Sequence, residues 1–362
     1  MKVAIALSFA IAGLVACPAQ AQAPAATKAE KAARPKSRKA AEPLFRSNDV
    51  IDLTIKAPFA SLSRSAAVAD AGVAGTVTVG GTADALPVTL SPRGITRRKR
   101  ETCPFPPLWV EFAAKPPSAS VFKGQIKLKL VTHCRAPESF QQFVLLEYAA
   151  YRLANVVMPA SFQARLARIN YVDQDGTALT TRTGFLIEDG GEVAKRNALH
   201  EVRNVPRIRS PQLDPRAAAR FAVFENMIGN LDWAMIAGPP GSDCCHNSRL
   251  MGARDATGAL VPVPYDFDYA GIVDAPYAVP PAQIKIASVR TRRYRGYCLH
   301  NAELGAVAAE FNAKRPQLLA VIDDLPQLDA GARAKARSYL EGFFEQIASP
   351  AAIADKFEKN CL

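Results

Sequence analysis

The sequence predicts an α+β fold with two lobes, a strand-rich first lobe over residues 44–188 and a mainly helical second lobe over residues 189–362. Three observations predict it. Apolar and polar residues alternate through most of the first part, which is the period of a strand. They recur at helical spacing through most of the second part. Gly190-Gly191 separates the two, and this order of elements leaves a natural cleft between the lobes.

The first lobe is predicted to hold seven strands and one helix. Alternation predicts five strands before residue 138, with Gly80-Gly81 as a turn signal, at 50–55, 75–79, 86–90, 108–112 and 125–130. The period then changes, and apolar residues at helical spacing predict an amphipathic helix within 139–155. Two further strands are predicted at 164–172 and 180–188.

The second lobe begins its helices at Asp214-Pro215, where Asp is a cap and Pro occupies the first turn. This helix is expected to run to about Ile228 and to end at Gly229. Short strands are predicted around 248–251 and 260–264, and two more helices at 301–312 and 330–347.

The first residues are typical of export. Residues 1–21 combine Lys2, an uncharged apolar run too short to span a membrane, and small residues, which together predict a cleaved signal peptide. Two processing routes stay open. Ala19-Gln20-Ala21 suits ordinary cleavage, whereas Leu14–Cys17 suits a lipoprotein signal in which Cys17 carries the lipid. The protein is therefore expected in the periplasm or cell envelope, with membrane attachment only through Cys17.

Residues 22–43 consist mostly of Ala, Lys, Arg and Pro and predict a disordered basic tether. Attraction to anionic lipid or cell-wall polymer and a simple solvated spacer are both compatible with it. The net charge of +12 is concentrated in this tether and in two loops, without a recognition motif. Nucleic-acid binding is therefore not expected.

Six cysteines remain after Cys17, and an even number in an exported chain predicts disulfides. Cys103 and Cys134 flank two strand-like segments and are predicted to pair. Cys244 and Cys245 are expected to pair with different distant partners, because a disulfide between adjacent residues is strained. A zinc site is not expected, since no matching C-x-x-C pairs occur.

The candidate site residues of the second lobe are carboxylates and an amide. Asp266 and Asp268 share one face of an extended segment, and such a pair is costly to desolvate unless a cation such as Mg²⁺ or Mn²⁺ joins it. Caps or solvated side chains are the alternative. Asp232 and Asn247 precede this pair in the chain. Phosphoryl transfer needs these parts, a carboxylate for the attacking hydroxyl and an Asn and an Asp for the metal.

The first lobe contributes cationic candidates. Lys127 and Lys129 project from one face of a strand and Glu147 lies on the next helix, which is how kinases hold the phosphates of ATP, although a solvated strand face is the alternative. Arg93-Gly94 lies in a loop where the backbone can approach a ligand. Glu188 ends the last strand, where it could contact a nucleotide base or ribose. The basic run 97–100 is expected to be a solvated or substrate-facing turn.

Taken together, these residues resemble the spore-coat protein H (CotH-type) kinase-like family over about residues 85–275. The matching features, in order, are Arg93-Gly94, the Lys129 strand with the Glu147 helix, Gly184-Phe185-Leu186-Ile187-Glu188, Asn230-x-Asp232, Asn247 and Pro264-x-Asp266-Phe267-Asp268.

The resemblance implies an atypical protein-kinase fold that transfers the γ-phosphoryl group of ATP to a protein hydroxyl. Asp232 would be the catalytic carboxylate, and Asp266 the principal metal ligand, helped by Asn247 and Asp268. Lys129 or Lys127 would contact the phosphates, with Glu147 to position it. The expected partner is a protein substrate or another protein of the envelope.

Two other functions remain open at this stage. An exported protein works where no ATP pool is expected, which favours a non-catalytic, pseudokinase-like scaffold. A metal-dependent hydrolase could instead use His133, His246, Asp266 and Asp268. The basic segment 288–298 lies outside the resemblance and could bind an acidic substrate or form a disulfide-fixed surface loop.

Overall fold

The computed structural model describes Met1, residues 39–64 and residues 72–362. The predicted signal peptide beyond Met1, and residues 22–38 of the predicted tether, lie outside the described residues. Helices make up 34% and strands 22% of the structure, and helices concentrate toward the C-terminus, so the predicted α+β class is confirmed. The last tether residues are described, and Lys39 forms an ion pair with Glu192 at 3.2 Å.

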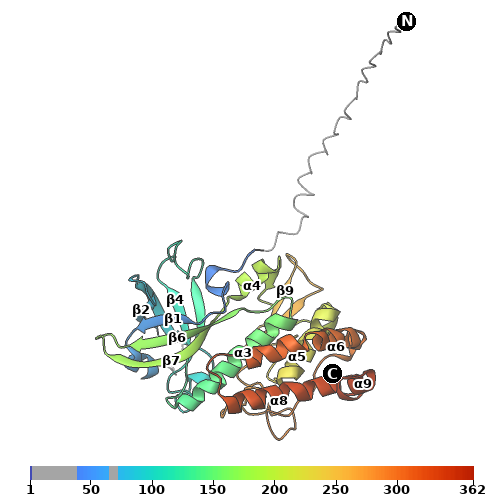
Figure 1. Cartoon of the computed structure of the whole chain (residues 1–362). Coiled ribbons are helices and arrows are strands. Elements are labelled where there is room, and N and C mark those ends of the chain that lie inside the picture. The colour runs from blue at the N-terminus through green and yellow to red at the C-terminus, as the bar shows by residue number, and fades with distance from the viewer. Residues whose placement is uncertain (2–38, 65–71) are drawn as a thin grey trace. The chain divides into compact units, whose positions relative to one another are not determined.

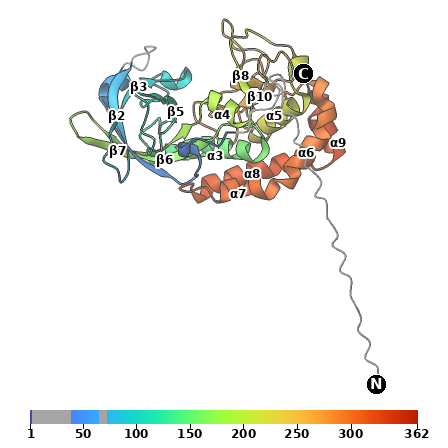
Figure 2. The ribbon, with the colours of Figure 1, turned by 90° about the horizontal axis from the view of Figure 1, so that it is seen from above.

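The strands of the first part close into a seven-stranded barrel (Figures 1 and 2). Around the barrel the strands are β1 (Ile51–Lys56), β2 (Val73–Val79), β3 (Leu86–Pro92), β4 (Leu108–Phe112), β5 (Lys127–Val131), β7 (Ala178–Ile187) and β6 (Ala164–Val172). Neighbouring strands are antiparallel except β1 and β6, whose parallel pairing closes the barrel. Closure removes the free edges that an open sheet would expose.

Alternating side chains of these strands form the interior of the barrel, with Leu53, Leu90, Leu130 and Ile169 among its buried residues. The short helix α2 (Phe59–Arg64) adds Phe59 to the same cluster.

His133 belongs to an aromatic group at this barrel. Its ring lies 4.4 Å from Phe105 and 5.4 Å from Tyr171. Burial, with help from the charge of Arg182, lowers the pKa of His133 to about 4. This histidine packs against the aromatic rings of the barrel.

Helices form most of the second part, and α3 (Gln141–Val157) lies between them and the barrel strands β6 and β7 (Figures 1 and 2). The other helices are α4 (Gly190–Arg196), α5 (Pro215–Ile228), α6 (Leu304–Ala313), α7 (Arg315–Asp323), α8 (Ala330–Gln346) and α9 (Pro350–Lys356). Short 3₁₀ turns are η1 (Pro43–Phe45), η2 (Thr96–Arg98), η3 (Glu138–Phe140), η4 (Ser210–Gln212), η5 (Cys298–Glu303) and η6 (Glu358–Asn360).

Helix α5 has the ends that its sequence predicts. The Asp214 side chain accepts a hydrogen bond from the Ala217 amide at 2.8 Å, which caps the first turn. The last turn ends at Gly229, whose φ of +69° is a left-handed conformation that glycine adopts without strain. The helix is buried along its length, so its end fixes the position of the residues that follow.

A small antiparallel sheet in the order β10-β9-β8 lies in the second part, with β8 (His200–Val202), β9 (Ser248–Gly252) and β10 (Val261–Pro264). Pro264 pairs with Ser248, so the residue before β9 lies beside the residue after β10. The Tyr265 amide accordingly donates to the Asn247 carbonyl at 3.1 Å. Pairing of two strands thus brings Asn247 next to the segment that carries Asp266 and Asp268.

The six cysteines lie in three pairs. Cys103 and Cys134 form a disulfide, as predicted, and Cys298 pairs with Cys361. The prediction of distant partners for the adjacent cysteines is wrong, because Cys244 is bonded to Cys245. The other four cysteines of the described residues are paired with one another.

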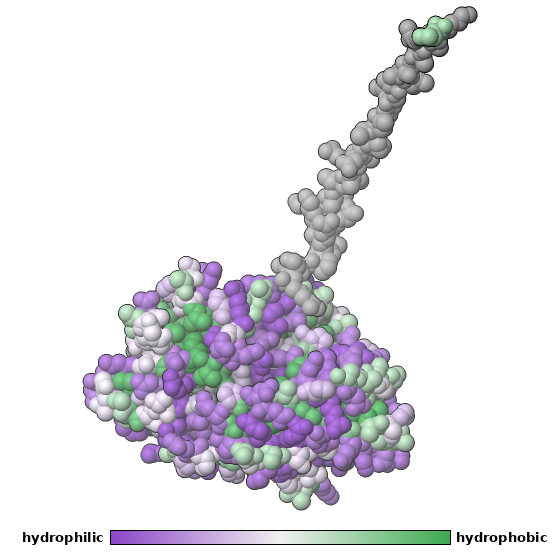
Figure 3. Space-filling model, viewed as in Figure 1, coloured by the Kyte–Doolittle hydropathy of each residue, from purple (hydrophilic) through white to green (hydrophobic). Residues whose placement is uncertain are grey.

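Hydrophilic residues cover most of the face in Figure 3, with apolar patches of which the broadest lies over the barrel. Among the described residues no helix is both long and apolar enough to cross a bilayer.

Candidate functional site

A cavity of about 580 Å³ is lined by side chains of the barrel and of the helical part. From the barrel come Trp109 on β4 and Lys129 on β5. Most of the predicted site residues line it: Arg93, Gly94, Lys129, Asp232, Asn247, Asp266 and Asp268. The chain therefore brings together in space residues that are separated by up to 175 positions.

Asp232 lies in the turn after α5 and is held from several sides. Its amide donates to the Asn230 side chain at 3.0 Å. The Asn247 side-chain amide donates to the Asp232 carbonyl at 2.6 Å and to Oδ2 at 3.1 Å. Nε2 of His246 lies 2.8 Å from Oδ1, and this hydrogen bond raises the pKa of His246. The carboxylate is therefore fixed in orientation while its side chain stays one-third exposed to the cavity.

Three carboxylates, those of Glu147, Asp266 and Asp268, form a cluster whose potential ligand oxygens lie within 4.8 Å of one another. The amide of Asp266 donates to the Tyr151 hydroxyl of α3 at 3.0 Å, and the Tyr277 hydroxyl donates to Asp268 at 3.1 Å. The first bond fixes the position of Asp266 relative to α3, and the second fixes Asp268 to the segment that carries Tyr277.

Arg97 lies among these carboxylates. Its guanidinium contacts Glu147 at 2.8 Å, Asp266 at 3.2 Å and Asp268 at 3.1 Å. The side chain is only 8% exposed, so Arg97 itself is not solvated, whereas Lys99 and Arg100 of the same run are exposed. A basic run gives no sign of this, because the carboxylates that attract Arg97 come from other parts of the chain.

The three carboxyls differ in their pKa values. Burial raises the pKa of Glu147, and it raises the pKa of Asp268 to about 7. Burial acts in the same direction on Asp266, but the charges of Arg93 and Arg97 outweigh it and hold the pKa of Asp266 below its ordinary value. Asp266 is thus the one carboxyl of the three whose pKa is lowered, and Arg93 and Arg97 balance its charge.

The predicted lysine partner of Glu147 is replaced by Arg97. Lys129 instead lies over aromatic rings, with Nζ 4.5 Å from the centroid of Tyr265 and 5.7 Å from that of Trp109. Burial, reinforced by the charge of Arg93, lowers the pKa of Lys129 to about 7. Lys127 is exposed, pairs with Glu111 at 2.9 Å and is not among the residues that line the cavity.

Arg93 and Gly94 lie at the cavity in the loop after β3. The Arg93 side chain is 7% exposed, and its nearest carboxylate oxygen is that of Asp266 at 3.7 Å. Its Nη1 atom is buried and has no hydrogen-bond partner among the described residues. Gly94 has a φ of +87°, and a Cβ there would meet nothing within 4 Å, which leaves the backbone open to a ligand.

Glu188 lies outside this group. Its carboxylate is buried, pairs with Arg196 at 3.0 Å and accepts a hydrogen bond from the Gln163 amide at 2.9 Å. It does not line the cavity. His133 does not line it either, so the pair of histidines needed by the hydrolase alternative is not brought together.

The basic segment 288–298 holds the turn that carries Asp232, a contact that sequence reasoning missed. Arg295 donates to the carbonyls of Leu231 at 2.6 Å and Trp233 at 3.0 Å, on either side of Asp232. Arg292 donates to the Met227 carbonyl at the end of α5 at 3.1 Å. The backbone carbonyls at the end of a helix attract cations, which accounts for the contact of Arg292 with Met227.

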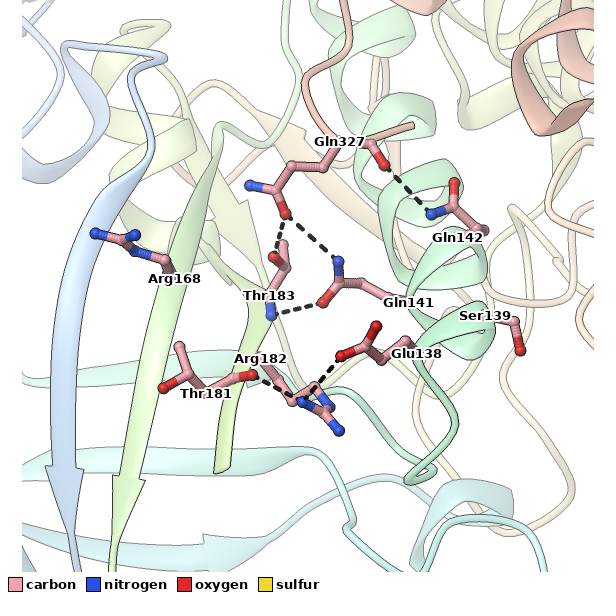
Figure 4. Close-up of a pocket in the computed structure, with 9 residues that line it drawn as sticks. All are labelled: Glu138, Ser139, Gln141, Gln142, Arg168, Thr181, Arg182, Thr183 and Gln327. Atoms are coloured by element: carbon pink, nitrogen blue, oxygen red, sulfur yellow. Dashed lines mark hydrogen bonds and ion pairs between the residues drawn. The ribbon is translucent and has the colours of Figure 1, made fainter. Parts of the chain in front are cut away.

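A second groove, of about 410 Å³, lies at the start of α3 (Figure 4). Its polar side chains are largely bonded to one another; the Thr183 hydroxyl, for example, donates to Gln327 at 2.6 Å. None of the predicted site residues lines it, so we assign the chemistry to the larger cavity.

Comparison with protein-family models and with curated proteins finds no match to this chain.

Proposed function

We propose that this protein is a kinase-like phosphotransferase, with the barrel as N-lobe and the helical part as C-lobe, that transfers a phosphoryl group to a protein hydroxyl. ATP is the donor that the resemblance to the CotH-type family implies. One observation carries the proposal. Asp232, Asn247, Asp266 and Asp268, which were predicted as catalytic and metal-binding residues, line the same cavity as Arg93 and Lys129.

Asp232 is suited to the role of the general base. Its carboxylate is oriented by Asn247 and by His246, and it is partly open to the cavity. An acceptor hydroxyl placed there would donate its proton to this carboxylate as its oxygen attacks the phosphorus. His246 keeps this carboxylate in orientation, with Nε2 2.8 Å from Oδ1.

Arg97 takes the part expected of Lys129. It is paired with Glu147 of α3, as the phosphate-contacting cation of a kinase is paired with a helix glutamate. The ion pair holds a guanidinium at the cavity wall, where it can donate to phosphate oxygens.

The side of the carboxylate cluster that faces the cavity offers ligands suited to a hard divalent cation. Asp266, Asp268 and Asn247 offer oxygen ligands to the cavity, which suits Mg²⁺ or Mn²⁺, whereas Glu147 is buried and engaged with Arg97. These three residues would hold the ion. When bound, it would neutralise charge on the phosphate oxygens.

The test is transfer of labelled phosphate from ATP to a protein acceptor by the disulfide-intact chain. Asp232→Asn should lower the rate by about 10²- to 10⁴-fold, because a positioned general base contributes that much, while ATP binding persists. Asp243→Asn is the matched control, since Asp243 lines the same cavity but is exposed. Equal rates for wild type and Asp232→Asn would contradict the assignment.

A non-catalytic binding module is the second candidate, and the position of Arg97 favours it. A cation that already contacts all three carboxylates would keep a metal from the centre of the cluster. Binding of ATP without any transfer, in wild type and in Asp232→Asn alike, is the result this alternative predicts.

A further inference from the structure

Cations gather around the two aromatic rings of the cavity. Lys129 Nζ lies 4.5 Å and Arg249 Cζ 5.2 Å from the centroid of Tyr265. Lys127 Nζ lies 5.0 Å from the centroid of Trp109, and Lys129 Nζ and Arg93 Cζ each lie 5.7 Å from it. Rings that could stack on a nucleobase are therefore already in contact with positive charges.

These cations have few partners within the protein. Among the described residues Lys129 has no carboxylate within ion-pair distance, and the nearest to Arg249 is Glu201 at 3.8 Å. The Arg93 side chain is only 7% exposed, and its buried Nη1 atom has no hydrogen-bond partner among those residues. Buried cations with unsatisfied donors are costly, and negative charges of a ligand would offset that cost.

The residue expected to contact a nucleoside is used elsewhere. Glu188, predicted to meet the base or ribose, is bound to Arg196 and to the Gln163 amide and does not line the cavity. The donor groups that remain around Tyr265 and Trp109 are charged, and they match phosphate oxygens better than the edge of a purine.

We propose that the cavity recognises its donor through a chain of condensed phosphates and contains no subsite for a nucleobase, so that inorganic polyphosphate serves as phosphoryl donor as well as ATP. Arg93, Lys129 and Arg249 bind the phosphates behind the reacting one. This inference rests on the proposed phosphotransferase function and names the chemical class of its donor. It also suits an exported protein, for which no ATP pool is expected.

The reaction balances without a further reactant. The acceptor hydroxyl oxygen forms a bond to the terminal phosphorus, and the bond from that phosphorus to the bridging oxygen breaks. The bridging oxygen leaves with the electron pair on the shortened chain, pyrophosphate when tripolyphosphate is the donor. The hydroxyl proton passes to the Asp232 carboxylate and from there to water.

Calorimetric titration of the disulfide-intact chain with tripolyphosphate, ATP and adenosine, each with Mg²⁺ and at fixed ionic strength, tests the inference. Tripolyphosphate should bind within about tenfold of ATP, and adenosine should show no binding, since charge-assisted bonds to phosphate supply the affinity. Lys129→Met and Arg249→Met should each weaken tripolyphosphate binding about tenfold or more. Lys123→Met is the matched control, because Lys123 is exposed and does not line the cavity.

The outcomes separate this inference from the function on which it rests. Binding of ATP at least about 100-fold tighter than tripolyphosphate, or competition by adenosine, would show a nucleobase subsite and overturn the inference, leaving the phosphotransferase proposal intact. Failure of a folded chain to bind either phosphate compound would overturn both. Equal weakening by Lys123→Met and Lys129→Met would indicate general charge attraction and also overturn it.

Discussion

Arg97 has the largest electrostatic consequence of any single residue at the cavity. It neutralises carboxylates of the barrel-side helix α3 and of the segment after β10, and no other described cation contacts all three. The charged carboxylates depend on Arg97, because these groups are buried and water cannot stabilise them once the guanidinium is removed.

Replacing Arg97 by Met should therefore lower the free energy of unfolding by about 3–5 kcal/mol. The loss should be larger at pH 8 than at pH 5, because protonation removes the uncompensated negative charge at low pH. Denaturant unfolding at both pH values measures it. Lys99→Met, an exposed change in the same basic run, should stay within about 0.5 kcal/mol, and an equally small loss for Arg97→Met would contradict the buried pairing.

Burial of Lys129 should lower the free energy of unfolding of the protein. Its pKa is about 7 in the folded chain and 10.5 ordinarily, so the unfolded chain binds more protons between these values. Wild-type stability should then rise with pH across this window. Lys129→Met should be more stable than wild type by roughly 2–4 kcal/mol at pH 7 and below, with the gain vanishing near pH 10. Denaturant midpoints from pH 6 to pH 10 test it; a constant difference would show that Lys129 is not desolvated.

At the scale of elements, strand pairing in the barrel and in the small sheet positions the residues of the candidate site. Pairing of β9 with β10 places Asn247 beside Asp266, and the end of α5 at Gly229 places Asp232. In the barrel, β5 and β7 pack closely at Gly184, where a Cβ would lie 2.5 Å from the carbonyl oxygen of Val131. Only a residue without a side chain allows this approach, which keeps Lys129 of β5 at the cavity.

Gly184→Ala should cost about 1–3 kcal/mol, because the added methyl group must displace backbone in a packed sheet. Thermal or denaturant unfolding measures the change. Gly258→Ala is the control, since a Cβ there meets nothing within 4 Å, and it should be neutral or slightly stabilising. Comparable stabilities for the two variants would mean that β5 and β7 are not held this closely.

At the scale of the whole molecule, local sequence patterns predicted most of the helices and strands but not the closure of the strands into a barrel. Alternation identifies strands such as β1 and β4, and helical spacing identifies α3 and α5, because both signals lie within a few residues. The barrel needs β1 to pair with β6, more than a hundred residues away, and no local pattern encodes that register. The small strand β8 and helices α7 and α9 were also missed.

Some features of the candidate site could likewise be predicted from the sequence, and others depend on the tertiary fold. Asp232, Asn247, Asp266 and Asp268 could be predicted because their residue types and order match a known chemistry. The exchange of Lys129 for Arg97 could not, since it depends on which cation the fold brings to Glu147. Arg295 was missed for the same reason, because its partners are backbone carbonyls that any sequence offers. The bond between Cys244 and Cys245 was judged too strained to form.

The central claim is that Asp266 holds a divalent cation for a phosphate-bearing ligand in this cavity. Calorimetric titration of the disulfide-intact chain with Mn²⁺ and ATP, beside Asp266→Ala and the cavity control Asp243→Ala, tests it most directly. We predict binding by wild type and Asp243→Ala that needs the metal, and loss of at least about tenfold in affinity in Asp266→Ala. Equal affinity in Asp266→Ala, or no binding by a folded wild-type chain, would contradict the account.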